Sequence, residues 1–117
     1  MNNYGKELIL DLHECNTDIF NKEGIQNFFD ELCGLIDMVQ RDVHWWEEGE
    51  PNEPHLVGTS AVQFIQPSNI VIHTLPVLKR VYLNIFSCKD FDADEAIRFC
   101  YEYFDGVVIN SHIIDRI

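Results

Sequence analysis

The spacing of apolar residues changes along this chain, and that change constrains the fold more than any other feature. Every second residue between Glu7 and His13 is leucine, which is typical of a half-buried strand. The next apolar residues recur at spacings of three and four and predict an amphipathic helix: Ile25, Phe28, Phe29, Leu32, Leu35, Ile36 and Val39. Asp18 or Asn21, in the polar segment between the two patterns, can cap that helix.

The segment after this helix predicts a short strand and a loop. Val43–Trp46 favours a strand, in which Trp45 and Trp46 point to opposite faces. Glu47–Pro54 holds four glutamates, two prolines and a glycine, and this composition predicts an exposed loop.

The second half of the chain returns to strand patterns. Alternation and β-branched residues predict further strands at Ala61–Ile65, Ile70–Thr74, Val81–Phe86 and Val107–Ile114. The first two are joined by the turn residues 66–69, which favours a hairpin. Asp92 and Glu95 form a capping box that opens a second helix, whose expected buried stripe is Ile97, Cys100, Tyr101 and Phe104.

Strands in runs, with two helices between them, indicate one α+β domain over residues 1–117. We expect a two-layer sandwich, in which two main helices pack on one face of a mostly antiparallel sheet. The chain shows no internal repeat and no linker. A core of this size buries a modest share of the chain's surface, so pairing into a homodimer would stabilise it.

Charge excludes one class of partner. The chain has 20 acidic and 8 basic residues and a net charge of −12, so its surface would repel nucleic acid. The acidic surplus can attract a cationic small molecule, or it can simply keep the protein soluble. The first residues lack the apolar stretch of a signal peptide and no run is long enough to span a bilayer, so we expect a cytoplasmic protein without a membrane partner.

The four cysteines give no metal-ligand pattern. Cys15, Cys33, Cys88 and Cys100 form no C-x-x-C pair and no zinc-ligand spacing, so we expect no metal. Cys33 and Cys100 lie within helical apolar patterns and are expected in the core.

Four segments, taken together, point to a family. They are the opening strand Gly5–Cys15, the G-T-S-A-V of Gly58–Val62, the S-N-I-V-I-H-T-L-P of Ser68–Pro76, and the N-I-F-S-C of Asn84–Cys88. In order and without gaps they resemble the prokaryotic S-adenosylmethionine decarboxylase proenzyme family, which is pyruvoyl-dependent. The corresponding family motifs are G-V-S-G-V, S-H-I-x-I-H-T-W-P and D-x-F-T-C. The resemblance covers nearly the whole chain.

This resemblance implies a self-processing enzyme. The Ser68 hydroxyl would attack the Pro67 carbonyl, the chain would split between these residues, and the new N-terminus at position 68 would become the pyruvoyl cofactor. That group forms a Schiff base with a substrate amine and accepts electrons as carbon dioxide leaves. His73 and Ser60 would assist processing, and Cys88 would return a proton to the substrate carbon. The implied substrate is S-adenosylmethionine, in spermidine biosynthesis, and the implied assembly is a homodimer.

Several positions depart from the family pattern. Pro67 stands where the family has glutamate, and Asn69 stands where it has histidine. Leu75 replaces a tryptophan, and Val77 replaces the glutamate that binds the ribose hydroxyls. Pro54 occupies the position of the aromatic residue that stacks on adenine, a role that Trp45 or Trp46 could fill. The substrate-binding residues therefore stay unassigned.

Two alternatives follow from these departures. The first is a pyruvoyl-dependent decarboxylase of a cationic amino acid, arginine or ornithine, attracted by Glu47, Glu48, Glu50 and Glu53. The second is an unprocessed, inactive homologue that acts as a binding or regulatory partner. Each candidate residue taken alone also has a structural interpretation: Ser68 and Ser60 as turn or strand residues, and His73 and Cys88 as core residues.

Overall fold

The computed structural model describes residues 3–49 and 52–117. Within them the chain forms strands, two α-helices and two short 3-10 helices: β1 (Gly5–His13), η1 (Thr17–Ile19), α1 (Lys22–Leu35), β2 (Val39–Glu48), η2 (Pro54–Leu56), β3 (Gly58–Gln66), β4 (Asn69–Leu75), β5 (Arg80–Ser87), α2 (Ala93–Tyr103) and β6 (Val107–Arg116). The strands make one sheet in the order β2-β3-β4-β5-β1-β6, with every neighbouring pair antiparallel. The α+β prediction is confirmed.

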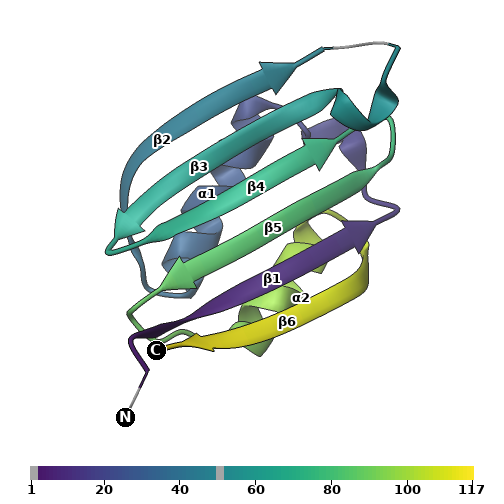
Figure 1. The fold of residues 1–117 in the computed structure, drawn as a ribbon. Helices are drawn as coiled ribbons and strands as arrows, with labels where there is room; N and C mark the ends of the chain where they lie inside the picture. The colour runs from purple at the N-terminus through teal and green to yellow at the C-terminus, as the bar shows by residue number, and fades with distance from the viewer. Residues whose placement is uncertain (1–2, 50–51) are drawn as a thin grey trace.

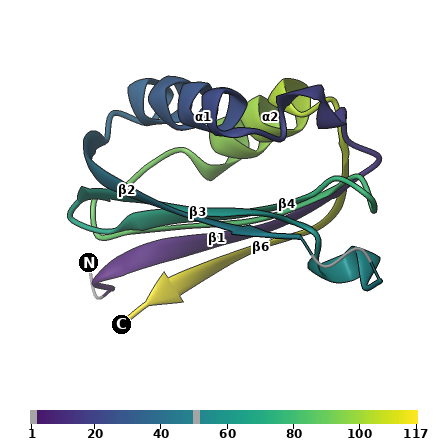
Figure 2. The same cartoon turned by 90° about the horizontal axis from the view of Figure 1, so that it is seen from above.

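Both α-helices cover the same face of the sheet (Figures 1 and 2). The leucines of β1 at positions 8, 10 and 12 are fully buried beneath them, as the alternation predicts. Cys33 on α1 and Cys100 on α2 also lie in this core, which confirms their expected place. We call the opposite face of the sheet, which no α-helix covers, the open face. No helix of the described part of the chain is long and apolar enough to cross a bilayer.

The helices begin where the capping residues predict, but the end of α1 and one residue of the expected buried stripe of α2 differ from the prediction. The side-chain oxygens of Asn21 and Asp92 accept hydrogen bonds from backbone N–H groups in the first turns of α1 and α2. The apolar spacing predicted a first helix as far as Val39, but α1 ends at Leu35. Asp37 adopts a left-handed φ of 57°, which a helix interior does not allow. Tyr101, expected in the buried stripe of α2, is 36% exposed.

The strand β2 is longer than the expected Val43–Trp46. It starts at Val39, has an irregularity in register between Gln40 and Val43, and runs to Glu48. Glu47 and Glu48 pair with Thr59 and Gly58 of β3, so these two glutamates belong to the strand and not to the loop. Charged side chains are common on an edge strand such as β2. The loop residues 50 and 51 lie outside the described residues.

The orientation of the two tryptophans agrees with the prediction. Trp45 packs toward the helices, with its ring centroid 6.4 Å from that of Phe29. Trp46 lies on the open face and is 67% exposed.

Phe28 is the centre of the aromatic core, and its removal should be costly. It is fully buried, and the ring centroids of Phe29, Phe99, Tyr103 and Phe104 lie 4.9 to 5.9 Å from its own. We expect Phe28→Ala to lower the free energy of unfolding by about 3–5 kcal/mol, because it leaves a cavity that the packed rings cannot fill. Urea denaturation measures the loss. The matched control is Tyr101→Ala, whose expected cost is at most about 1 kcal/mol; equal losses for the two variants would contradict this description of the core.

Candidate active site

Two of the expected site residues meet on the open face. Ser60 of β3 and His73 of β4 stand directly opposite each other in the strand register. A hydrogen bond of 2.8 Å joins the Ser60 Oγ to the His73 Nδ1. Gly58 begins the same strand, and a Cβ there would lie 2.2 Å from the carbonyl oxygen of Thr74, so the close approach of β3 to β4 requires glycine. The arrangement can orient a hydroxyl and move a proton through an imidazole.

Ser68 and Cys88 lie at the other end of the same strands. Ser68 occupies the turn between β3 and β4, where its carbonyl oxygen accepts a hydrogen bond of 2.9 Å from the Ile65 N–H. The next residue, Asn69, pairs with Phe86 near the end of β5, and Cys88 follows that strand directly. The register therefore brings Ser68 and Cys88 to one end of the sheet. Pro67 is exposed in the turn, and the Gln66–Pro67 peptide bond is cis.

A single chain does not gather all four residues. His73 lies five residue positions after Ser68 along extended backbone, which corresponds to about 16 Å at the usual rise of a strand. The structure thus forms two half-sites: the Ser60–His73 pair, and the Ser68–Cys88 end of the sheet.

Tyr4 is a neighbour of Cys88 that the sequence analysis missed. The pKa of Tyr4 is raised, chiefly because of a hydrogen bond with Cys88. Strand β1 approaches this end closely at Gly5, where a Cβ would lie 2.3 Å from the carbonyl oxygen of Ser87. The glycine at position 5 was the available signal, since a glycine at the start of a strand often marks a close backbone contact.

The remaining cysteines are unsuited to proton transfer at neutral pH. Burial raises the pKa values of Cys15 and Cys33 to about 11, and burial raises the pKa of Cys100 further. These thiols stay protonated and serve as small apolar groups. Cys88 is partly exposed, which leaves its thiol accessible to a small molecule.

Two hollows on the open face meet at the Ser60–His73 pair. The smaller, of about 140 Å³, is mainly apolar and is lined by Trp46, Val62 and Val71 together with that pair. The larger, of about 370 Å³, is lined by Glu48 and Tyr82, among others, together with the same pair. Val77, which stands in place of the ribose-binding glutamate, is 56% exposed in the turn after β4.

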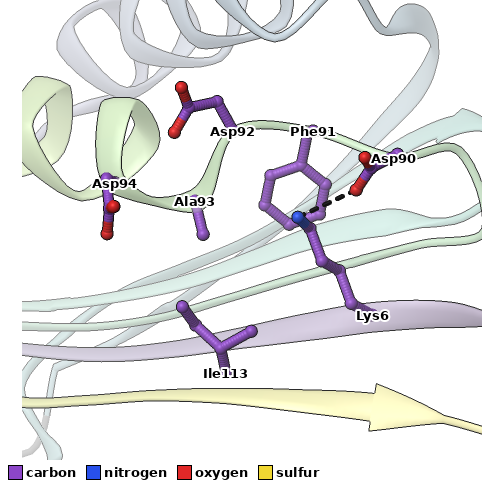
Figure 3. A pocket seen from close by; sticks show the side chains of 7 residues that line it. All are labelled: Lys6, Asp90, Phe91, Asp92, Ala93, Asp94 and Ile113. Atoms are coloured by element: carbon purple, nitrogen blue, oxygen red, sulfur yellow. Dashed lines mark ion pairs between the residues drawn. The ribbon is translucent and has the colours of Figure 1, made fainter.

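A further hollow, of about 600 Å³, lies on the helix side of the sheet (Figure 3). Three of its polar side chains, Lys6, Asp90 and Asp92, are already engaged within the protein. The Lys6 Nζ lies 2.9 Å from the Asp90 carboxylate and 4.8 Å from the centre of the Phe91 ring, and this ammonium group lowers the pKa of Asp90. Asp92 caps α2. We interpret this hollow as the join between β1 and the loop that leads to α2. In the described segments, no group of three or more His, Cys, Asp or Glu residues is arranged to hold a metal ion.

Comparison with known proteins identifies the family. The family model of S-adenosylmethionine decarboxylase matches residues 6–117. The S-adenosylmethionine decarboxylase proenzyme of Saccharolobus solfataricus is 28% identical over 85 residues, which cover 72% of this chain and 63% of that protein; the match thus spans slightly less than two thirds of that relative's length. The crystal structure of the adenosylmethionine decarboxylase from Aquifex aeolicus shares the fold, with a TM-score of 0.82 at 19% identity, over 99% of this chain and 92% of that one. Because the family model matches almost the whole chain, this protein belongs to the S-adenosylmethionine decarboxylase family.

Proposed function

We propose that this protein is a self-processing, pyruvoyl-dependent decarboxylase of S-adenosylmethionine that acts in spermidine biosynthesis in the cytoplasm. The observation that carries the proposal is the hydrogen bond between Ser60 and His73, which couples a hydroxyl to an imidazole on the open face. The relative from Saccharolobus solfataricus is named a proenzyme, and this supports a processing step in the present chain.

Ser68 is the nucleophile that starts self-cleavage. Its Oγ attacks the carbonyl carbon of Pro67, the C–N bond between the two residues breaks, and an ester forms in its place. β-Elimination then releases Pro67 as a carboxylate. Hydrolysis of the new N-terminus with loss of ammonia leaves a pyruvoyl group. In the proposed assembly, His73 carries the proton and Ser60 orients the ester.

The turn at Ser68 fits a pyruvoyl group. It is a partly exposed position at the end of two strands, and the partly exposed Cys88 lies at the same end. The group supplies a carbonyl that condenses with the substrate's amine and accepts the electrons released as carbon dioxide leaves. Cys88 then donates the proton that the substrate carbon needs.

A homodimer would complete the site. The two half-sites lie at opposite ends of β4, so a two-fold axis that runs across the strands between two open faces would bring Ser60 and His73 of one protomer over Ser68 of the other. Exposed apolar side chains on this face favour its burial, among them Phe64 and Ile114, which are both 43% exposed.

The substrate is tested by carbon dioxide release from carboxyl-labelled S-adenosylmethionine, arginine and ornithine, measured side by side on processed protein. We expect release from S-adenosylmethionine alone, because the open face offers an indole and an apolar hollow that suit a nucleoside. Ser68→Ala is the control and should release none from any substrate. Activity confined to arginine or ornithine would replace the proposed substrate, and a processed protein inactive on all three would contradict both substrate classes.

A further inference from the structure

Trp46 is the more exposed of the two tryptophans, and it lies on the open face in line with Ser60 and His73. The register sets Trp46 opposite Ser60, which is itself opposite His73, so the three side chains form a row across β2, β3 and β4 on the open face. The indole is 67% exposed, whereas Trp45 packs against the core. So large an exposed apolar surface contributes little to folding and more often marks a site of binding.

Glu48 lies on the same face, two residues farther along β2. The Trp46 indole N–H donates a hydrogen bond of 2.5 Å to its carboxylate oxygen Oε1. This contact joins the edge of the indole to Glu48 and leaves much of the ring surface exposed. The second carboxylate oxygen can accept hydrogen bonds from a ligand, since an ionised carboxylate is an acceptor only.

The two residues line different hollows that share the Ser60–His73 pair. Trp46 borders the apolar hollow of about 140 Å³, and Glu48 borders the more polar one of about 370 Å³. Together they offer an aromatic surface, a carboxylate and a proton-transfer pair around one continuous site, and the larger hollow has the size of a small-molecule site.

We propose that Trp46 and Glu48 form the nucleoside subsite for the substrate, an inference that rests on the proposed function. The adenine base stacks on the Trp46 indole in the apolar hollow, and the Glu48 carboxylate accepts hydrogen bonds from the ribose hydroxyls. The sulfonium cation is attracted by the carboxylate and by the π-surface of the indole. The methionine portion then extends toward Ser60 and His73.

The test compares Trp46→Ala, Trp46→Phe and Glu48→Gln with two controls on the helix layer, Tyr101→Ala and Glu102→Gln. Each protein is first checked for processing by intact mass. The KM and kcat for S-adenosylmethionine are then measured, together with the Kd for methylthioadenosine by calorimetry. Methylthioadenosine keeps the adenine and ribose but lacks the α-amino and carboxyl groups of the methionine portion, so its binding reports the nucleoside subsite alone.

We expect Trp46→Ala to raise both KM and the methylthioadenosine Kd by about 5- to 150-fold with little change in kcat, as the loss of a base-stacking ring does. Trp46→Phe should recover most of this loss, and Glu48→Gln should raise both constants about tenfold. The controls should match the wild type.

Unchanged KM and Kd in Trp46→Ala and Glu48→Gln would overturn the subsite while leaving the decarboxylase proposal intact. A wild type that is processed but releases no carbon dioxide from S-adenosylmethionine would overturn both. If Trp46→Ala does not fold, Glu48→Gln decides, because this substitution keeps the size and shape of the side chain.

Discussion

Replacing Ser68 by alanine is expected to leave the protein as one chain of full mass, whereas the wild type separates into residues 1–67 and 68–117. The loss should be complete, because alanine has no hydroxyl to attack the Pro67 carbonyl and the acyl shift has no other nucleophile in the turn. A denaturing gel and intact mass after long incubation measure the two species. Ser111→Ala is the matched control, since it removes an exposed hydroxyl on β6 and should be processed normally.

A wild type that stays whole after long incubation would contradict the enzymatic proposal. It would favour the remaining alternative, an unprocessed homologue that acts as a binding or regulatory partner. The mass of the fragment that begins at position 68 also distinguishes the two kinds of cleavage, because simple hydrolysis keeps the serine nitrogen and pyruvoyl formation loses it as ammonia.

Periodicity was sufficient to predict the fold layers, since the side chains that repeat most regularly are those the core buries. The leucines of β1 and the phenylalanines of α1 follow this rule. The end of α1 did not follow it, because Val39 continues the apolar spacing beyond the left-handed Asp37 but lies in β2, where its side chain is 52% exposed. Apolar spacing does not report backbone continuity, so it does not reveal the turn between α1 and β2.

The identity of the proposed site residues came from motifs, while their arrangement depends on strand pairing. Ser60 meets His73 through the β3–β4 hairpin, a local pairing that the turn residues predict. The contact of Tyr4 with Cys88 requires β1 to pair with β5, from opposite ends of the chain. Trp46 faces Ser60 only because of the register of β2, which shifts between Gln40 and Val43. Neither of the last two contacts could be derived from spacing along the sequence.

His73→Ala is expected to slow self-cleavage by about 10²- to 10⁴-fold, which is the usual contribution of a positioned acid–base group. The intact and cleaved chains are followed by mass over time. His112→Ala is the control, because His112 is an exposed histidine of β6, three positions from the β4 strand of His73 in the sheet order, and takes no part in the Ser60 hydrogen bond. Cleavage of His73→Ala at the wild-type rate would remove His73 from the processing step.

Co-expression of His73→Ala with Ser68→Ala tests whether the site is shared between protomers. In a mixed dimer, the Ser68 of the first variant faces the intact Ser60–His73 pair of the second, so cleavage of the His73→Ala chain should return while the Ser68→Ala chain stays whole. A site contained within one chain predicts no cleavage in the mixture, because each chain lacks one essential residue. The control partner carries both substitutions and should rescue nothing, since it supplies neither group. Rescue by this double variant would show that dimerisation alone promotes cleavage, and no rescue by Ser68→Ala would contradict the shared site.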